Sequence, residues 1–315
     1  MKFYMAPLQS YTTSFYRQAH ALTYGKMHKY FTPFFEDTGK SLALIKFEPE
    51  LNLQLNNELN VVPQVATNNA SFLVSFAKEM KRRGFNEINI NMGCPFPMLV
   101  KRGRGGGILN YPDKVSELLR TFEKANLDLK LSVKMRLGID NNHQGQEVIN
   151  VLNKYQLEEL ILHPRLVTQK YSGVPDWDSF ELFCQQCIHP VVANGDITSK
   201  TVLSSLKERF KTIDTFMIGR GLLSSPDLFS TLNNTSPNPP IQTLHQHYYG
   251  LITSHYTDWN QAFNFLQSFW HYPLNLSIEG QRLLRKLKKH NKPKLYAEWL
   301  ARVNSHLSDR IHPFT

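Results

Sequence analysis

The chain is poor in cysteine, with only Cys94, Cys184 and Cys187 among its 315 residues. An odd and sparse set argues against a disulfide framework and indicates a reducing compartment, so we expect a cytoplasmic protein. Long apolar runs are also missing: none reaches about 18 residues, the length of a membrane-spanning helix. The opening residues, MKFYMAPLQSYTT, lack the apolar core of a signal peptide. These absences favour a globular protein without a membrane partner.

Acidic residues are outnumbered. The chain has 36 Lys and Arg against 26 Asp and Glu, a net charge of +10. Such an excess favours polyanionic partners such as nucleic acid, although it is also compatible with a merely non-specific attraction. A length of 315 residues fits one large barrel, or a barrel with a small added domain.

Short apolar runs alternate with longer amphipathic stretches along the first two thirds of the chain. The expected strands are residues 2–8, 30–36, 61–66, 87–91, 131–137, 160–165, 190–195 and 215–221. Helical patterns lie between several of them, at 71–84, 112–126 and 198–210. Eight apolar strands separated by helices predict an α/β fold, a (β/α)8 TIM barrel with its active face at the carboxyl ends of the strands.

The barrel pattern stops near Phe229. Residues 230–240 are rich in Asn, Ser, Thr and Pro and are interpreted as a linker. Beyond them, residues 243–259, 260–270, 277–290 and 294–307 have helical patterns. We therefore expect a catalytic barrel at 1–229 and a C-terminal α-helical domain at 241–315.

Cys94 follows the fourth expected strand in the sequence NINMGCPFP. Gly93 allows a sharp turn and Pro95 stiffens the exit from it. A thiol on this loop would lie at the catalytic face, where it could act as a nucleophile or a general acid. A small buried thiol is the common structural alternative.

Two polar residues lie where apolar strands end. Lys134 interrupts LSVKMRL, and a lysine there is costly unless it points into a site. With Met135 and Leu137 facing the other way, Lys134 would point into the barrel mouth. His163 closes the run LILH in the same way. A snorkelling lysine and a structural histidine are the alternatives.

Three segments suggest phosphate contacts. The turns after the seventh and eighth strands offer Asn194, Gly195, Gly219 and Arg220 as backbone and guanidinium donors. The glycine-rich run 103–107 is neither a Walker loop nor a dinucleotide fingerprint, and we interpret it as an RNA-facing loop. The neighbouring basic residues that could meet an RNA backbone are Lys101, Arg102 and Arg104.

The tail contains a second basic feature. Residues 281–294 hold seven Lys and Arg and no acidic residue. On a helix, Leu283, Leu284 and Leu287 would occupy the face opposite the basic one. A solvated amphipathic helix is the alternative, but an unbalanced basic face favours a nucleic-acid clamp. Its members are Arg282, Arg285, Lys286 and Lys289.

In their order, these segments resemble the tRNA dihydrouridine synthases, a family of FMN-dependent enzymes. The resemblance is carried by MAPL, VPQVA, NINMGCPFPMLVKRGRGGGIL, SVKMRLG, LHPR, VVANGDI and MIGRG, from residue 2 to about 229. The glycine-rich run is most similar to the bacterial C-type members. The resemblance implies FMN at the mouth of a TIM barrel, a helical tRNA-binding domain, NADPH as electron donor, and uridine reduced to 5,6-dihydrouridine.

The resemblance also implies roles for individual residues, with Cys94 as the proton donor to C5 of uracil and hydride reaching C6 from the reduced flavin. His163 would lie between flavin and substrate. Asn91 and Arg165 would contact the uracil. The remaining residues would hold the cofactor: Ala6, Pro7 and Leu8 along the flavin ring, Gln64 and Lys134 at its edge, and Asn194, Gly195, Asp196, Gly219 and Arg220 at its phosphate.

The chain departs from the family pattern at Thr13, where an acid is usual, and at Leu8, Pro164 and Leu166. We expect a monomer with tRNA as its partner and no metal.

Two other functions remain open. One is an FMN-dependent oxidoreductase for a small molecule, of the dihydroorotate dehydrogenase type. The other is a non-catalytic RNA-binding protein.

Overall fold

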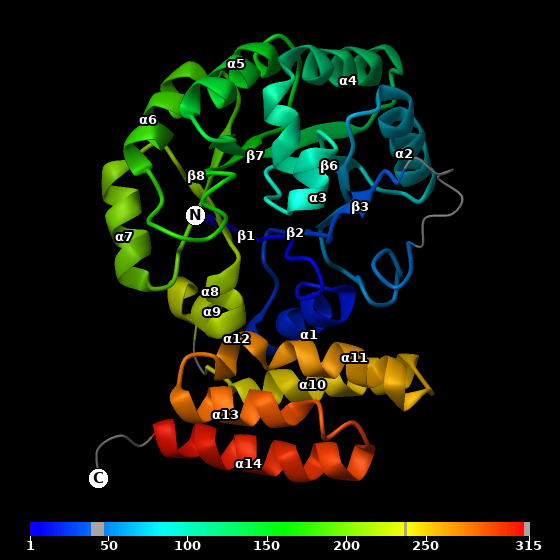
Figure 1. The fold of residues 1–315 in the computed structure, drawn as a ribbon, viewed down its shortest axis with the longest axis vertical. Helices are drawn as coiled ribbons and strands as arrows, with labels where there is room; N and C mark the ends of the chain where they lie inside the picture. Colours follow the sequence, from blue (N-terminus) through cyan, green and yellow to red (C-terminus); the bar gives the residue numbers. More distant parts are fainter. Residues whose placement is uncertain (39–46, 236–237, 312–315) are drawn as a thin grey trace.

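The computed structural model describes residues 1–38, 47–235 and 238–311, which form a β/α barrel above a layered helical region (Figure 1). All strand pairs of the sheet are parallel. The strands are β1 (Lys2–Met5), β2 (Lys29–Phe31), β3 (Phe35–Glu36), β4 (Val61–Val62), β5 (Gln64–Ala66), β6 (Glu87–Met92), β7 (Lys130–Gly138), β8 (Leu160–Leu166), β9 (Val191–Asn194) and β10 (Thr215–Ile218).

The ten strands correspond to the eight expected ones. The run at 30–36 is divided into β2 and β3, and the run at 61–66 into β4 and β5. Pro33 and Pro63 lie at the two interruptions, where proline removes a backbone donor from the ladder. Because β2 pairs with β4 and β3 pairs with β5, these two interrupted strands lie side by side and close the ring. The predicted TIM barrel is confirmed.

Helices follow the strands around the outside of the barrel. Asn69, Asn141, Asp176 and Ser199 cap four of them by accepting a hydrogen bond from a backbone N–H of the first turn. The helices of this part are α1 (Ser14–Tyr24), α2 (Ala70–Arg82), α3 (Pro97–Lys101), α4 (Pro112–Lys124), α5 (Asn142–Leu152), α6 (Trp177–Gln186), α7 (Lys200–Arg209), α8 (Arg220–Ser224) and α9 (Leu228–Asn233).

The helical region holds five helices, which are α10 (Ile241–His255), α11 (Trp259–Phe269), α12 (His271–Leu274), α13 (Ile278–Leu287) and α14 (Pro293–Ile311). The short α12 was not expected from the sequence. The expected linker at 230–240 needs a correction, because α9 continues to Asn233 with Leu232 buried. The apolar pair Phe229 and Leu232 keeps this segment packed on the barrel despite its polar composition. The division into domains at 229 and 241 stays a prediction.

Aromatic side chains attach the helical region to the barrel. Phe15 on α1 meets Phe265 on α11 edge to face, at 5.2 Å between ring centroids. Tyr16 on α1 lies near Phe269 of α11 and Tyr248 of α10. Thr13, which stands where the resembled family usually has an acid, is the buried N-cap of α1 at this junction. The five helices thus form one continuous core with the barrel wall.

Within the described part of the chain, no helix has the length and apolar character needed to cross a membrane.

Candidate active site

A cavity of about 530 Å³ opens at the carboxyl ends of the barrel strands, within the size range of small-molecule sites. The loops after β1, β6, β9 and β10 surround it, and side chains of β7 and β8 form its floor. Most of the residues predicted for cofactor and substrate meet here, namely Ala6, Pro7, Leu8, Asn91, Cys94, Lys134, His163, Asn194, Gly195, Asp196, Gly219 and Arg220.

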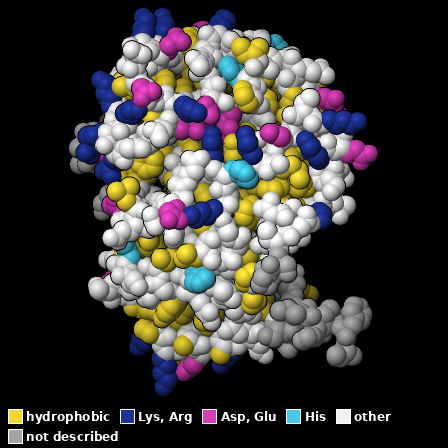
Figure 2. Space-filling view, turned by 180° about the vertical axis from the view of Figure 1, so that it is seen from behind, with side chains coloured by type: hydrophobic (Ala, Val, Ile, Leu, Met, Phe, Trp, Pro, Cys, Tyr) yellow, Lys and Arg dark blue, Asp and Glu magenta, His cyan; other side chains and the backbone are white. Residues whose placement is uncertain are grey.

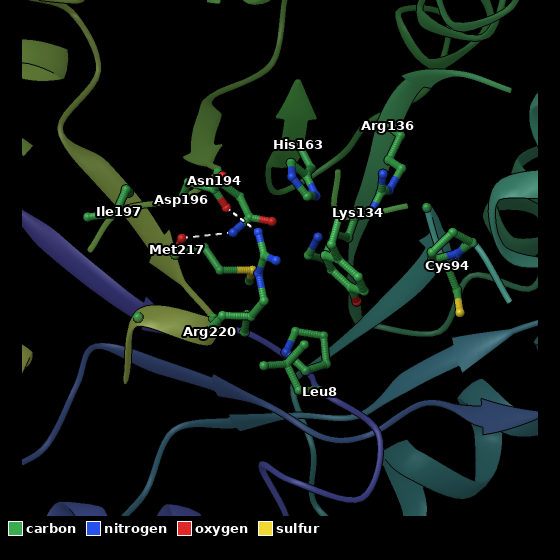
Figure 3. Close-up of a pocket in the computed structure, with 18 of the residues that line it drawn as sticks. Leu8, Cys94, Lys134, Arg136, His163, Asn194, Asp196, Ile197, Met217 and Arg220 are labelled. Carbon is green, nitrogen blue, oxygen red and sulfur yellow. Dashed lines mark hydrogen bonds and ion pairs between the residues drawn. The ribbon is translucent and has the colours of Figure 1, made fainter. Parts of the chain in front are cut away.

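Three cations converge on the cavity: Lys134, Arg136 and Arg220 (Figure 3). Burial, with Arg136 beside it, lowers the pKa of Lys134 to about 7. Burial also lowers the pKa of Arg136 to about 10. Among the described lining residues, Asp196 is the one carboxylate. The cavity therefore carries an excess of positive charge that suits an anionic ligand.

Asp196 sits at a left-handed backbone position, with φ of 43°. Its two oxygens accept hydrogen bonds from Arg165 and Arg220. Burial alone would raise the pKa of Asp196, but the two guanidinium groups hold it below its ordinary value. Asp196 thus fixes the direction in which Arg220 points at the cavity.

Arg165 is buried beneath the cavity and is not one of its lining residues. Its donors go to Asp196, to the Ser172 and Gly173 carbonyls, and to Nε2 of His163 at 3.1 Å. A direct contact between Arg165 and a uracil is therefore not supported, because its side chain is occupied within the protein.

His163 gains a defined tautomer from this neighbour. A guanidinium only donates, so Nε2 of His163 must accept and the ring proton resides on Nδ1. Burial, with the nearby cations, lowers the pKa of His163 well below its ordinary value. His163 thus lines the cavity as a neutral imidazole.

Cys94 lies across the cavity from Asp196 and Arg220 (Figure 3). The backbone N–H groups of Gly93 and Cys94 donate to Oδ1 of Asn91, at 3.1 and 2.9 Å. A Cβ on Gly93 would lie 3.3 Å from the Met135 backbone, so glycine at this position avoids a tight contact. Burial raises the pKa of the Cys94 thiol. The structure therefore keeps this thiol protonated near neutral pH.

The glycine-rich run is not an RNA-facing loop, which corrects the sequence interpretation. Gly105, Gly106 and Gly107 are buried, and a Cβ on Gly106 would lie 2.3 Å from Val167. The Gly106 N–H donates to the Cys94 carbonyl at 3.0 Å. These glycines let the chain pass directly behind the cysteine loop, so their role is to support it.

The basic residues around this run differ in exposure. Lys101 and Arg102 are exposed, and Arg102 forms an ion pair with Glu36 at 3.1 Å. Arg104 is mostly buried and contacts Glu36, Asp37 and Asn68. Of the three predicted RNA contacts, the structure leaves Lys101 and Arg102 accessible and engages Arg104 within the protein.

Gln64 lies below the cavity and is fully buried. Its amide donates to Asn89 and accepts from Asn91, at 2.7 and 2.8 Å. The predicted contact between Gln64 and the flavin edge therefore stays a prediction, and the structure shows a supporting position under Asn91.

Arg136, Tyr171 and Tyr272 are among the lining residues that sequence reasoning missed. Arg136 is two positions after Lys134, and the two-residue period of a strand was a usable signal for it. Tyr171 comes from the loop after β8, with its ring 4.7 Å from the Arg220 guanidinium. Tyr272 comes from α12, in the helical region, and packs on Tyr11 at 5.0 Å. No local pattern indicated that α12 would reach the site.

Three of the departures from the resembled pattern, Leu166, Leu8 and Pro164, lie at or beside the cavity. Leu166 contacts the site through its backbone carbonyl, which accepts a hydrogen bond from Arg136 at 2.8 Å. Its side chain takes no part in this contact. Leu8 lines the cavity directly, and its N–H donates to the Thr12 hydroxyl. Pro164 lies beside Gly195.

On α13, Leu283 and Leu287 are buried and the predicted basic residues Arg282, Arg285 and Lys286 are exposed. Lys289 is also exposed and lies in the turn after the helix. The helix thus has the two faces that its sequence predicts. Seen from behind, Lys and Arg side chains gather at the lower end of the helical region, beside an acidic side chain, and others lie over the barrel among Asp and Glu (Figure 2).

Among the described residues, no group of three His, Cys, Asp or Glu side chains is arranged to hold a metal ion.

Fold and cavity together define a TIM-barrel protein with a cationic small-molecule site at the carboxyl ends of its strands. The family model for dihydrouridine synthase (Dus) matches residues 4–305. The chain therefore belongs to the dihydrouridine synthase family.

Curated relatives agree in name. The chain is 28% identical over 188 residues to tRNA-dihydrouridine synthase B of Vibrio vulnificus, covering 58% of each protein. It is 30% identical over 152 residues to that of Pasteurella multocida, covering 48% of this chain and 45% of the relative. A probable tRNA-dihydrouridine synthase of Helicobacter pylori is 28% identical over 237 residues, 73% of this chain and 65% of that protein. The matches thus span about half the length of the first two relatives. The closer likeness to C-type members stays a prediction.

Solved structures share the fold. A 2-naphthoyl-CoA reductase superposes with a TM-score of 0.57 at 8% identity, over 74% of this chain and 50% of its own. Morphinone reductase superposes with a TM-score of 0.52 at 10% identity, over 77% of this chain and 88% of its own. At such identities these likenesses show the barrel alone.

Proposed function

We propose that the protein is a tRNA dihydrouridine synthase that uses FMN and Cys94 to reduce uridine. The observation that carries this proposal is one cavity, in a chain matched by the dihydrouridine synthase model, whose lining holds a thiol of raised pKa together with Lys134, Arg136 and Arg220. NADPH as the source of electrons is a further part of the proposal.

The cavity fits a phosphate-bearing cofactor, because its cations exceed its carboxylates and two turns converge on Arg220. Arg220, Asn194, Gly195 and Gly219 would hold the phosphate end. Ala6, Pro7 and Leu8 would lie along the ring, with Lys134 at its edge. When bound, reduced FMN supplies hydride, which the reaction places on C6 of uracil.

Cys94 supplies the proton that C5 needs. This role requires a protonated thiol, so a pKa raised by burial suits a general acid and not a nucleophile. Asn91 and His163 line the cavity with N–H donors for uracil oxygens. Lys134 would be drawn to its charged form by the anionic reduced ring, since its pKa of about 7 makes the charge easily gained or lost.

The uridine must leave its stack in the RNA to reach this cavity, at a cost of a few kcal/mol. The exposed cations of α13, with Lys101 and Arg102, would offset that cost through phosphate contacts. A small-molecule oxidoreductase would have no use for this basic helix, which argues against the dihydroorotate dehydrogenase type.

The test is mass-spectrometric mapping of dihydrouridine in tRNA from cells that lack the gene. The proposal expects one or more sites to lose the modification, and to regain it with the wild-type gene but not with Cys94→Ala. Unchanged dihydrouridine, with no paralogue acting at the same site, would refute the proposal.

A further inference from the structure

A chain of hydrogen-bonded side chains runs through the interior of the barrel, from its base to the cysteine loop. We name this chain the interior column, and its members are Lys29, Glu87, Ser132, Asn89, Gln64 and Asn91. Five of them are less than a tenth exposed. The side chain of Lys29 is 12% exposed, at the base of the barrel.

The lower end of the column has a fixed polarity. Lys29 only donates, and its Nζ lies 2.7 Å from one oxygen of Glu87. Glu87 only accepts when ionised, so the Ser132 hydroxyl donates to its other oxygen, at 2.7 Å. With its proton used, Ser132 accepts from Nδ2 of Asn89 at 2.9 Å.

The upper end is fixed independently. The backbone N–H groups of Gly93 and Cys94 only donate, so Asn91 must turn its oxygen to them. Its amide nitrogen then donates to Gln64 at 2.8 Å, and the Gln64 nitrogen donates to the Asn89 oxygen at 2.7 Å. Each amide in the middle has one orientation that satisfies both ends.

This polarity determines what Asn91 shows to the cavity. Its oxygen is used twice and one of its N–H groups is used by Gln64, so its second N–H is the one remaining polar group. Asn91 therefore presents a donor, which suits a carbonyl oxygen and not an amino group.

We propose that Asn89 and Ser132 are positioning residues: through Gln64, they hold Asn91 so that its N–H faces the cavity and its oxygen holds the loop of Cys94. The turnover readout of this proposal rests on the proposed function above. The ligand class that the column selects is a ring with a carbonyl oxygen next to the reacting carbons.

The alternative is that the column only stabilises the barrel, as any satisfied buried polar network does. The two roles differ in one respect. If the column only stabilises the barrel, the loss of turnover in each variant should follow its fall in melting temperature. If the column positions Asn91, the loss of turnover should be larger the closer the substituted residue lies to Asn91 along the column.

The experiment compares three variants. Asn89→Leu removes the hydrogen bonds of Asn89 with Gln64 and Ser132. Ser132→Ala, one step further from Asn91, removes the hydrogen bonds of Ser132 with Asn89 and Glu87. Tyr4→Phe is the matched control, because it deletes a buried hydroxyl that donates to Glu159 at 2.9 Å, off the path between Glu87 and Asn91. If Asn89→Leu does not fold, Ser132→Cys, of similar volume and weaker hydrogen bonding, takes its place.

Two readouts are measured on the purified flavoprotein. One is kcat and KM with tRNA, together with bound FMN by absorbance. The other needs no activity: the rate at which iodoacetamide alkylates Cys94 relative to Cys184, by mass spectrometry of each site. We expect kcat to fall about tenfold for Asn89→Leu, less for Ser132→Ala and not for Tyr4→Phe, with FMN content unchanged. The Cys94 to Cys184 alkylation ratio should change in the same order.

The proposal is overturned if the alkylation ratio is unchanged in all variants. It is also overturned if kcat falls in step with melting temperature, so that Tyr4→Phe lowers kcat as much as Ser132→Ala does. If the wild-type protein proves inactive on tRNA while the alkylation ratio is graded, the proposed function fails and the positioning role stands.

Discussion

The two ends of the barrel interior are both charged, but their charges are balanced differently. At the base, Lys29 lies between Glu87 and Glu159, at 2.7 and 3.1 Å. Burial alone would lower the pKa of Lys29, but these carboxylates raise it above its ordinary value. At the mouth, Lys134, Arg136 and Arg220 share one lining carboxylate, and burial lowers the pKa of Lys134 and Arg136.

A protein gains nothing in stability from uncompensated buried cations, because each has lost its hydration without a partner. The base of the barrel shows that this chain can pair its interior charges. The unpaired charge at the mouth is therefore a property of the site, kept for a ligand. Substitutions at the base should accordingly change stability, and substitutions at the mouth should change activity.

The largest expected effect is at the mouth. Cys94→Ala should lower tRNA turnover by about 10²–10⁴-fold, the range for loss of a general acid, while bound FMN and melting temperature stay close to wild type. Turnover is measured by dihydrouridine formed per enzyme. Cys184→Ala, on the outer helix α6, is the control and should remain active. Turnover within a few-fold of wild type would show that Cys94 is not the proton donor.

The next effect is at the base. Lys29→Met leaves two buried carboxylates without their cation, so we expect the free energy of unfolding to fall by about 3–5 kcal/mol. Urea denaturation at pH 7 measures it. Lys130→Met, which breaks an exposed pair with Glu158, is the control and should cost little. A Lys29→Met protein as stable as the control variant would contradict the distinction between the two ends.

A smaller effect of opposite sign is expected for Lys134→Met in the protein freed of FMN. The pKa of Lys134 in the folded protein, about 7, lies below the value of about 10.4 for an unfolded lysine. At pH 7 and below, the charged lysine therefore destabilises the folded state relative to the unfolded state. The variant should be more stable there, by roughly a few kcal/mol. Its advantage should shrink as pH rises from 7 towards 10, which thermal melts across that range would detect. If the stability of Lys134→Met relative to wild type increased with pH, the prediction would be wrong.

The smallest effect concerns the exposed cations of α13 and of the turn after it, where Lys289 lies. Lys286→Ala and Lys289→Ala should each lower tRNA affinity a few-fold and reduce the slope of log affinity against log salt by about one. Filter binding at several salt concentrations measures the slope. Lys124→Ala, equally exposed but on the barrel helix α4, should leave it unchanged. Equal slopes for all three variants would place the RNA elsewhere.

Much of the barrel could be predicted from the sequence because its signals are local. Alternating apolar runs mark the strands, and the motifs after them place Cys94, Lys134 and Arg220 in one cavity. What failed was set by contacts between distant residues. The run Gly105–Gly107 reads as an open loop, and only its contacts with Val167 and Val100 show that it is buried. Arg165 was assigned to the ligand because no local pattern shows that its side chain is held by Asp196 and by the Ser172 and Gly173 carbonyls.

Tyr272 has a consequence for engineering the family. It belongs to the tail by sequence, yet its side chain is part of the cavity wall beside Arg220. Chimeras that exchange tails between relatives at the Asn234–Pro240 segment would therefore transplant one wall of the cavity together with the proposed RNA-binding surface. In such hybrids, altered site preference and altered turnover would be inherited together, so the two parts are not independent modules.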